Sequence, residues 1–87
     1  MRRKYRSVAG IMLDILECLE EPEVLTKVAT CANLPYDRAK GIVERMIEKG
    51  YLRKRSDGKL EVTSEGRKAL KKLKELKDMM EALGFKL

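Results

Sequence analysis

An Asp-Gly pair at residues 57–58 constrains the fold of this 87-residue chain more than any other feature. Two short runs of mixed apolar and charged residues, 51–55 and 59–63, flank the pair. Asp-Gly between two such runs is a strong signal for a tight β-hairpin. The residues expected to face inward are Leu52, Leu60 and Val62. The sequence therefore predicts one two-stranded hairpin late in the chain.

Three helices are expected before the hairpin, because apolar residues recur there at helical spacing. The first begins after Ser7, which is placed to cap it, and ends where Pro22 stops it. The second runs from about Thr26, as a cap, to Ala32. The third starts near Pro35, since proline suits the first turn of a helix. Gly50 ends the third helix in a left-handed conformation.

A long final helix is expected over residues 64–83, capped by Thr63 or Ser64. At ~1.5 Å per residue it would span about 30 Å. Its apolar residues lie three or four apart, and the last four keep the spacing of a coiled-coil seam. We therefore expect a homodimer that pairs through this helix. The predicted interface residues are Leu13, Leu73, Leu76, Met80, Leu83 and Leu87.

The order of these elements predicts a mostly α-helical fold with a small β-hairpin, which is the plan of a winged helix-turn-helix with a long C-terminal helix. The chain divides into a basic N-terminal arm (residues 1–6), a winged helix-turn-helix domain (7–63) and a C-terminal dimerisation helix (64–87). The hairpin is the wing, and the third helix is the recognition helix.

Charge and composition narrow the function. The net charge is +6, which favours an anionic partner, either nucleic acid or an acidic membrane surface. The chain contains no histidine, its three serines belong to no base-bearing catalytic constellation, and its glycines form no phosphate-binding loop. We therefore expect neither enzymatic activity nor a cofactor.

The two cysteines, Cys18 and Cys31, cannot complete a four-ligand zinc site in a chain without histidine, so no metal is expected. Cytosolic disulfides are uncommon, which favours two reduced thiols over the alternative of a disulfide or redox switch. No apolar run approaches the ~20 residues of a membrane span. A cytoplasmic protein that does not contact membranes is the expectation.

Four stretches carry a family resemblance: Leu-Thr-Lys-Val at 25–28, Ala-Asn-Leu at 32–34, Glu-Lys-Gly-Tyr-Leu at 48–52 and Val-Thr-Ser-Glu-Gly-Arg at 62–67. With them the chain resembles an archaeal winged-helix DNA-binding family described as ArnR-like. The resemblance implies DNA binding and dimers formed by antiparallel final helices. Two departures are Pro35, where the family usually has a serine-like cap, and the shorter final helix.

In this arrangement the recognition helix enters the major groove, the helix before it contacts phosphates, and the wing lies along the flanking backbone. The predicted DNA-binding residues are Thr26, Lys27, Thr30, Tyr36, Arg38, Lys40, Gly41, Arg45, Arg53, Lys54, Arg55 and Lys59. The simpler interpretations are a solvated helix face and a wing edge protected by lysines. Glu44 and Glu48 would repel phosphates, so the prediction depends more on the wing than on the helix. The acidic residues of 7–25 should face away from DNA.

The predicted function is binding of double-stranded DNA by a homodimer, as an archaeal transcriptional regulator. One alternative is a nucleoid-type architectural protein with little sequence preference. Another is a winged helix that binds protein partners, which Glu44 and Glu48 would favour. Two interpretations of the basic arm stay open: it adds phosphate or minor-groove contacts, or it is a solvated tail.

Overall fold

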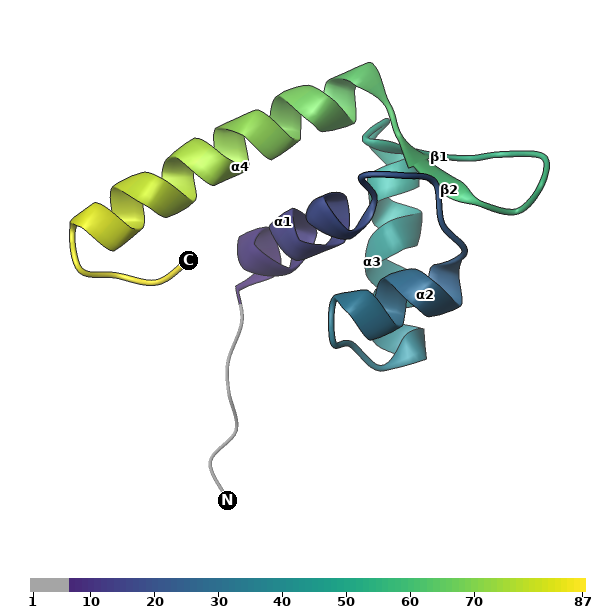
Figure 1. The fold of residues 1–87 in the computed structure, drawn as a ribbon, viewed down its shortest axis with the longest axis horizontal. Helices are drawn as coiled ribbons and strands as arrows, with labels where there is room; N and C mark the ends of the chain where they lie inside the picture. Colours follow the sequence, from purple (N-terminus) through teal and green to yellow (C-terminus); the bar gives the residue numbers. More distant parts are fainter. Residues whose placement is uncertain (1–6) are drawn as a thin grey trace.

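Three short helices form a cluster from which a β-hairpin projects on one side and a long helix on the other (Figure 1). This computed structural model describes residues 7–87. The elements are α1 (Val8–Cys18), α2 (Leu25–Cys31), α3 (Tyr36–Glu48), β1 (Leu52–Lys54), β2 (Leu60–Val62) and α4 (Ser64–Ala82). The predicted fold class, a winged helix-turn-helix with a long C-terminal helix, is confirmed. Over residues 7–87 no helix combines the length and apolarity that crossing a bilayer requires.

The starts of the first two helices differ in how their free N–H groups are satisfied. Ser7 caps α1 as predicted, since its Oγ accepts a 3.0 Å hydrogen bond from the Gly10 backbone N–H. The prediction that Thr26 caps α2 is wrong: the cap position is Val24, which offers no side-chain acceptor. Thr26 lies inside the helix, where its carbonyl accepts from the Thr30 hydroxyl at 3.1 Å.

The end of α1 falls earlier than predicted. The helix stops at Cys18, and the backbone of Leu19 has already left the helical region with φ −108° and ψ 37°. Pro22 therefore lies in the loop after α1 rather than at the end of the helix. Leu19 is nevertheless buried in the core, where it is 4% exposed.

The recognition helix α3 has the boundaries that proline and glycine predict. Pro35 occupies the position before its first residue, and Gly50 follows its end with φ +85°. The N–H of Gly50 donates to the Ile47 carbonyl at 3.0 Å, and that of Tyr51 donates to the Met46 carbonyl at 2.8 Å. This pair of bonds closes the last turn and directs the chain into β1.

The wing is an antiparallel pair in which Leu52 lies opposite Val62 and Lys54 opposite Leu60. Gly58 has φ +85° at its tip, as the Asp-Gly signal predicts. An additional antiparallel bridge joins Glu23, in the α1–α2 loop, to Leu60. These two residues exchange both backbone hydrogen bonds, at 2.8 and 3.2 Å. The wing is therefore fastened to the loop that precedes α2.

The long helix α4 begins where Thr63 accepts a 3.0 Å hydrogen bond from the Gly66 N–H. Gly66 is buried against the wing, and a Cβ there would lie 2.1 Å from the Tyr51 carbonyl oxygen. After α4 the chain reverses at Gly84, with φ +89°. The tail returns to α1, since a Cβ at Gly10 would lie 3.2 Å from the backbone oxygen of Leu87.

One apolar core joins all of these elements except the distal half of α4. The buried residues that form it are Ile11, Ile15, Leu16, Leu19, Val28, Ala32, Val43, Met46, Leu52 and Leu60. Leu70 and Leu73 of α4 pack against its edge. The core fixes the angle between α3 and the wing, which are the two elements expected to contact a partner.

The last residues of α1 and α2 are joined by a disulfide between Cys18 and Cys31, whose Cα atoms are 6.0 Å apart. The prediction of two reduced thiols is therefore wrong. The expectation of free thiols was based on the rarity of disulfides in the cytosol. The packing of α1 on α2, however, brings the two helix ends within the Cα separation that a disulfide needs. The bond closes the segment that contains the α1–α2 loop.

Candidate nucleic-acid interface

A basic stripe runs along one flank of α3. Its members are Arg38, Arg45 and Lys49, which lie seven and four residues apart and so share one side of the helix. All three are exposed, and none of them forms an ion pair with any residue in 7–87. Gly41 lies between Arg38 and Arg45 on the same flank, and nothing lies within 4 Å of a Cβ placed there. The stripe is therefore open to an anionic partner.

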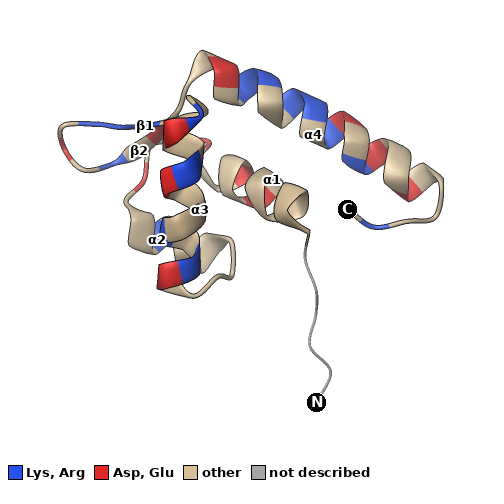
Figure 2. Cartoon of the chain, turned by 180° about the vertical axis from the view of Figure 1, so that it is seen from behind, with Lys and Arg blue, Asp and Glu red and all other residues tan. Residues whose placement is uncertain are grey.

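An acidic stripe lies beside the basic one, on the part of α3 directly opposite the core. Its members are Asp37, Glu44 and Glu48, all of them exposed. Figure 2 shows the resulting red and blue bands along α3. A duplex that meets α3 head-on would face the carboxylates, whereas one that approaches along the basic flank meets cations. The favourable approach is therefore tilted toward the flank that carries Arg38 and Arg45.

The basic stripe borders a groove between α3 and the N-terminal end of α1. The groove has a volume of about 570 Å³. Besides the basic stripe and Gly41, it is lined by Val8, Met12, Ile42, Met46 and Tyr51. Sequence analysis missed Lys49, which lines this groove with Arg38 and Arg45. Its spacing of four residues from Arg45 was the signal that could have found it.

Half of the predicted wing cations are paired with carboxylates. Arg53 forms an ion pair with Glu61 on the opposite strand. Arg55 contacts Asp57 at 2.9 Å and Glu61 at 3.7 Å. Lys54 and Lys59 are exposed, and within residues 7–87 they form no ion pair. The carboxylate of Glu61 therefore makes the net charge of the wing less positive than its four cations alone imply. The sequence analysis did not count Glu61 against these cations.

The predicted contacts of α2 lie apart from the basic stripe. Thr26, Lys27 and Thr30 line a shallow surface depression with Cys31, and this depression shares no residue with the α1–α3 groove. Lys27 is 3.8 Å from Glu23, in an i,i+4 ion pair. These side chains are exposed, so they are accessible to a phosphate backbone.

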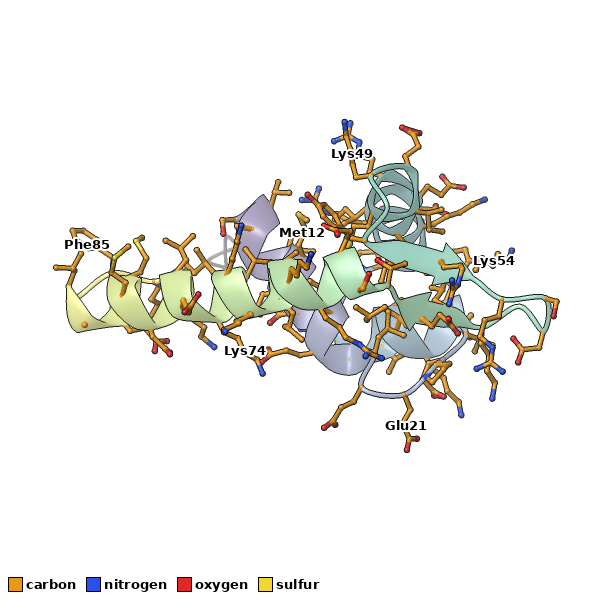
Figure 3. The ribbon with its side chains drawn as sticks, turned by 90° about the horizontal axis from the view of Figure 1, so that it is seen from above. Met12, Glu21, Lys49, Lys54, Lys74 and Phe85 are labelled. Carbon is orange, nitrogen blue, oxygen red and sulfur yellow. A yellow bond between two sulfur atoms is a disulfide. The ribbon has the colours of Figure 1, made fainter. Side chains whose placement is uncertain are left out.

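The remaining predicted DNA-binding residues are Tyr36 and Lys40, both exposed on α3 and both outside the basic stripe. The basic arm, residues 1–6, lies outside the described residues. Viewed from above, Lys49 and Glu21 extend to opposite sides of the molecule, and Lys54 extends from the wing (Figure 3). The α1–α2 loop that holds Glu21 thus lies on the other side from the end of the basic stripe.

The predicted dimer residues divide into two groups. Leu73, Leu76 and Met80 are half-buried along α4, and Leu83 at its end is 65% exposed. Leu13 is only 1% exposed within a single chain, and Leu87 lines the same small cavity. Leu13 is therefore already buried within one chain, where α1 lies against α4 and the returning tail. Two exposed apolar residues that the sequence analysis did not include are Met79 and Phe85, at 54% and 62% exposure.

Comparison with known proteins agrees with this architecture. Residues 5–81 match the winged helix-turn-helix family. The chain is similar in structure to Sso10a-2, a DNA-binding protein from Sulfolobus solfataricus, with a TM-score of 0.81 and 27% sequence identity. That match covers 90% of this chain and 85% of Sso10a-2. No curated protein sequence matches the chain. The chain belongs to the winged helix-turn-helix family.

Proposed function

We propose that the protein binds double-stranded DNA and acts in the cytoplasm as a homodimeric transcriptional regulator of the archaeal, ArnR-like type. The observation that carries the proposal is the unpaired basic stripe of Arg38, Arg45 and Lys49 around the open position Gly41. Arginine pairs with guanine edges and lysine with phosphates, and a residue without a side chain lets a groove wall approach closely. The similarity to Sso10a-2, a DNA-binding protein, supports the same function.

The wing and the start of the helix-turn-helix extend this surface. Lys54 and Lys59 remain available for phosphates on the flanking backbone, and Arg53 and Arg55 join them when their carboxylate partners are displaced. Thr26, Lys27 and Thr30 supply further contacts from α2. Most of these contacts are to phosphates, which fix position without reading sequence.

The homodimer is proposed to form through the distal half of α4. That half extends beyond the core and exposes Met79, and the residues just after it expose Leu83 and Phe85. Apolar side chains of this size on an unpacked helix end favour burial against a second copy. Lys74 extends from α4 to the side opposite Phe85, which lies in the tail just after the helix (Figure 3), so this end of the molecule offers an apolar surface for pairing and a basic side to solvent.

An architectural role with little sequence preference is the second candidate. The observation that favours it is the acidic stripe of Asp37, Glu44 and Glu48 on the outermost part of α3. Carboxylates there oppose deep insertion into a major groove and leave fewer side chains to read bases.

Titration against a selected duplex and a random duplex over a range of salt tests the proposal. Replacing Arg38, Arg45 and Lys49 with Gln should weaken binding strongly and reduce the salt slope by roughly 2–3 units. Replacing Arg67, Lys71 and Lys74 with Gln removes the same charge from α4 and is the matched control. Equal losses in both variants would leave only a net-charge effect and contradict the proposed surface.

Comparison of a selected duplex with a random one separates the two roles. A duplex recovered from a random pool that binds far more tightly than a random duplex supports the regulator, and equal affinities for the two support the architectural role.

A further inference from the structure

The α1–α3 groove has an apolar floor that phosphate contacts do not require. Val8, at the first turn of α1, is 59% exposed, and Met12, Ile42 and Tyr51 are half-buried beside it. Contacts to the DNA backbone come from cations and hydrogen-bond donors. An apolar surface held open next to three unpaired cations instead has the composition of a small-molecule site, in which a few polar groups orient an apolar ligand.

Gly41 lines this groove without a side chain. A glycine within a helix is less stable than an alanine, so its presence at an exposed helical position has a cost. Neither packing nor backbone conformation requires it, because a Cβ would meet nothing within 4 Å and the residue has ordinary helical φ. The open space it leaves is continuous with the apolar floor and lies between Arg38 and Arg45.

We propose that the groove binds an amphipathic anion: an aliphatic chain that ends in a carboxylate. The chain would lie over Gly41 against Val8 and Ile42, where it removes apolar surface from water. The carboxylate would pair with Arg45, whose guanidinium suits the planar group. The volume of about 570 Å³ lies within the roughly 300–1,000 Å³ typical of ligand sites.

The positive charge of the basic stripe favours an anionic ligand in the groove over the chain's own N-terminal arm. The arm contains Arg2, Arg3, Lys4 and Arg6, and it would bring these cations against those of the basic stripe. An anionic head group instead neutralises the stripe. Because the same arginines serve the proposed DNA surface, the ligand and a duplex compete, and this part of the inference rests on the proposed function.

Methionine methyl NMR on the full chain with decanoate as the probe tests the site without DNA. Met12 and Met46 line the groove, whereas Met79 and Met80 lie on distal α4. Decanoate should shift the Met12 and Met46 methyl signals saturably and leave the other two in place. Decanol and decyltrimethylammonium should bind at least about tenfold more weakly, because they lack the negative charge. Shifts centred on Met79 and Met80, or equal binding of all three probes, would overturn the proposal.

Two variants and a matched control locate the ligand. Gly41→Leu places an apolar side chain at the groove, where its Cβ meets nothing within 4 Å, and should abolish the decanoate shifts. Arg45→Gln should weaken binding about tenfold. Arg67→Gln removes one cation from α4, outside the groove, and should leave decanoate binding unchanged. Undiminished binding by Gly41→Leu would contradict the site, provided that its circular dichroism spectrum matches the parent protein.

Competition with a labelled duplex separates this inference from the proposed function. Decanoate should displace DNA from the parent protein and should not displace any DNA that Gly41→Leu retains. If the chain binds no DNA but the methyl shifts occur, the proposed function fails and the ligand site stands. If DNA binds and the methyl signals do not move, the ligand site fails alone.

Discussion

Arg53 and Glu61 face each other across the two strands of the wing and form an ion pair. Glu61 also lies 3.7 Å from Arg55, so one carboxylate holds two of the wing's cations. Exposed pairs of this kind contribute little to stability. Their consequence is for binding, because a phosphate must displace Glu61 before it contacts either arginine.

Replacing Glu61 with Gln should therefore tighten DNA binding, by about fivefold at low salt, and make its salt dependence steeper. Fluorescence anisotropy over a salt series measures both. Glu65→Gln is the matched control, since it removes a carboxylate that is 3.3 Å from Lys68 on α4. An equal gain in the control would show that only net charge matters, and no gain at Glu61 would contradict a role for the wing arginines.

Two glycines should respond oppositely to alanine. Gly41→Ala places a methyl in open space within a helix, and we expect it to stabilise the protein by about 0.5–1 kcal/mol. Gly66→Ala places a Cβ 2.1 Å from the Tyr51 carbonyl oxygen, so α4 must move away from the wing. We expect a loss of at least about 2 kcal/mol. Urea denaturation measures both, and a neutral Gly66→Ala would show that the contact between wing and α4 is loose.

The disulfide should contribute strongly to stability. Cys18 and Cys31 are 13 residues apart, and closing a loop of about this length stabilises a protein by about 3 kcal/mol. Replacing both with Ala should lower the Tm by on the order of 10–20 °C. Thermal unfolding with and without a reductant gives the comparison. Reduction should lower the Tm of the parent protein and leave that of the double variant unchanged. If the reductant does not change the Tm of the parent protein, the result would argue against the disulfide.

Dimerisation should depend on the distal half of α4. A chain that ends at Lys72 lacks Met79, Leu83 and Phe85, and sedimentation should show a monomer. Because this truncation also removes the part of α4 and the tail that lie beside Leu13, the full chain with Leu83→Glu provides a gentler test. Leu83 is 65% exposed, so the charge should prevent pairing without disturbing the fold of one chain. A Leu83→Glu protein that remains dimeric would place the interface elsewhere.

Features set by local backbone chemistry were predictable from the sequence. Gly50 and Gly58, the second residue of the Asp-Gly pair, take the positive φ values that glycine favours, and they lie where the turns were expected. Thr63 caps α4, and the basic residues of α3 are exposed. These signals extend over a few residues and do not depend on the rest of the fold.

Features that depend on spatial neighbours far apart in sequence were not predictable. The disulfide needs the ends of α1 and α2 to meet, and the pairing of Arg53 with Glu61 needs the exact register of the wing. Leu13 lay outside the main apolar stripe of its helix, yet it is buried where α1 meets α4 and the returning tail. The acidic stripe of α3 was visible as single carboxylates, but its place opposite the core requires the orientation of the helix.

The backbone bridge between Glu23 and Leu60 limits how the protein can adapt to a partner. It ties the wing to the loop before α2, and the disulfide ties the end of α2 to the end of α1. The wing, α2 and α1 are thus linked to one another, which limits how far they can separate around a partner. A duplex that contacts both the wing and α2 must therefore bend to fit them. The protein would then favour DNA sequences that bend easily, even at base pairs that it does not contact.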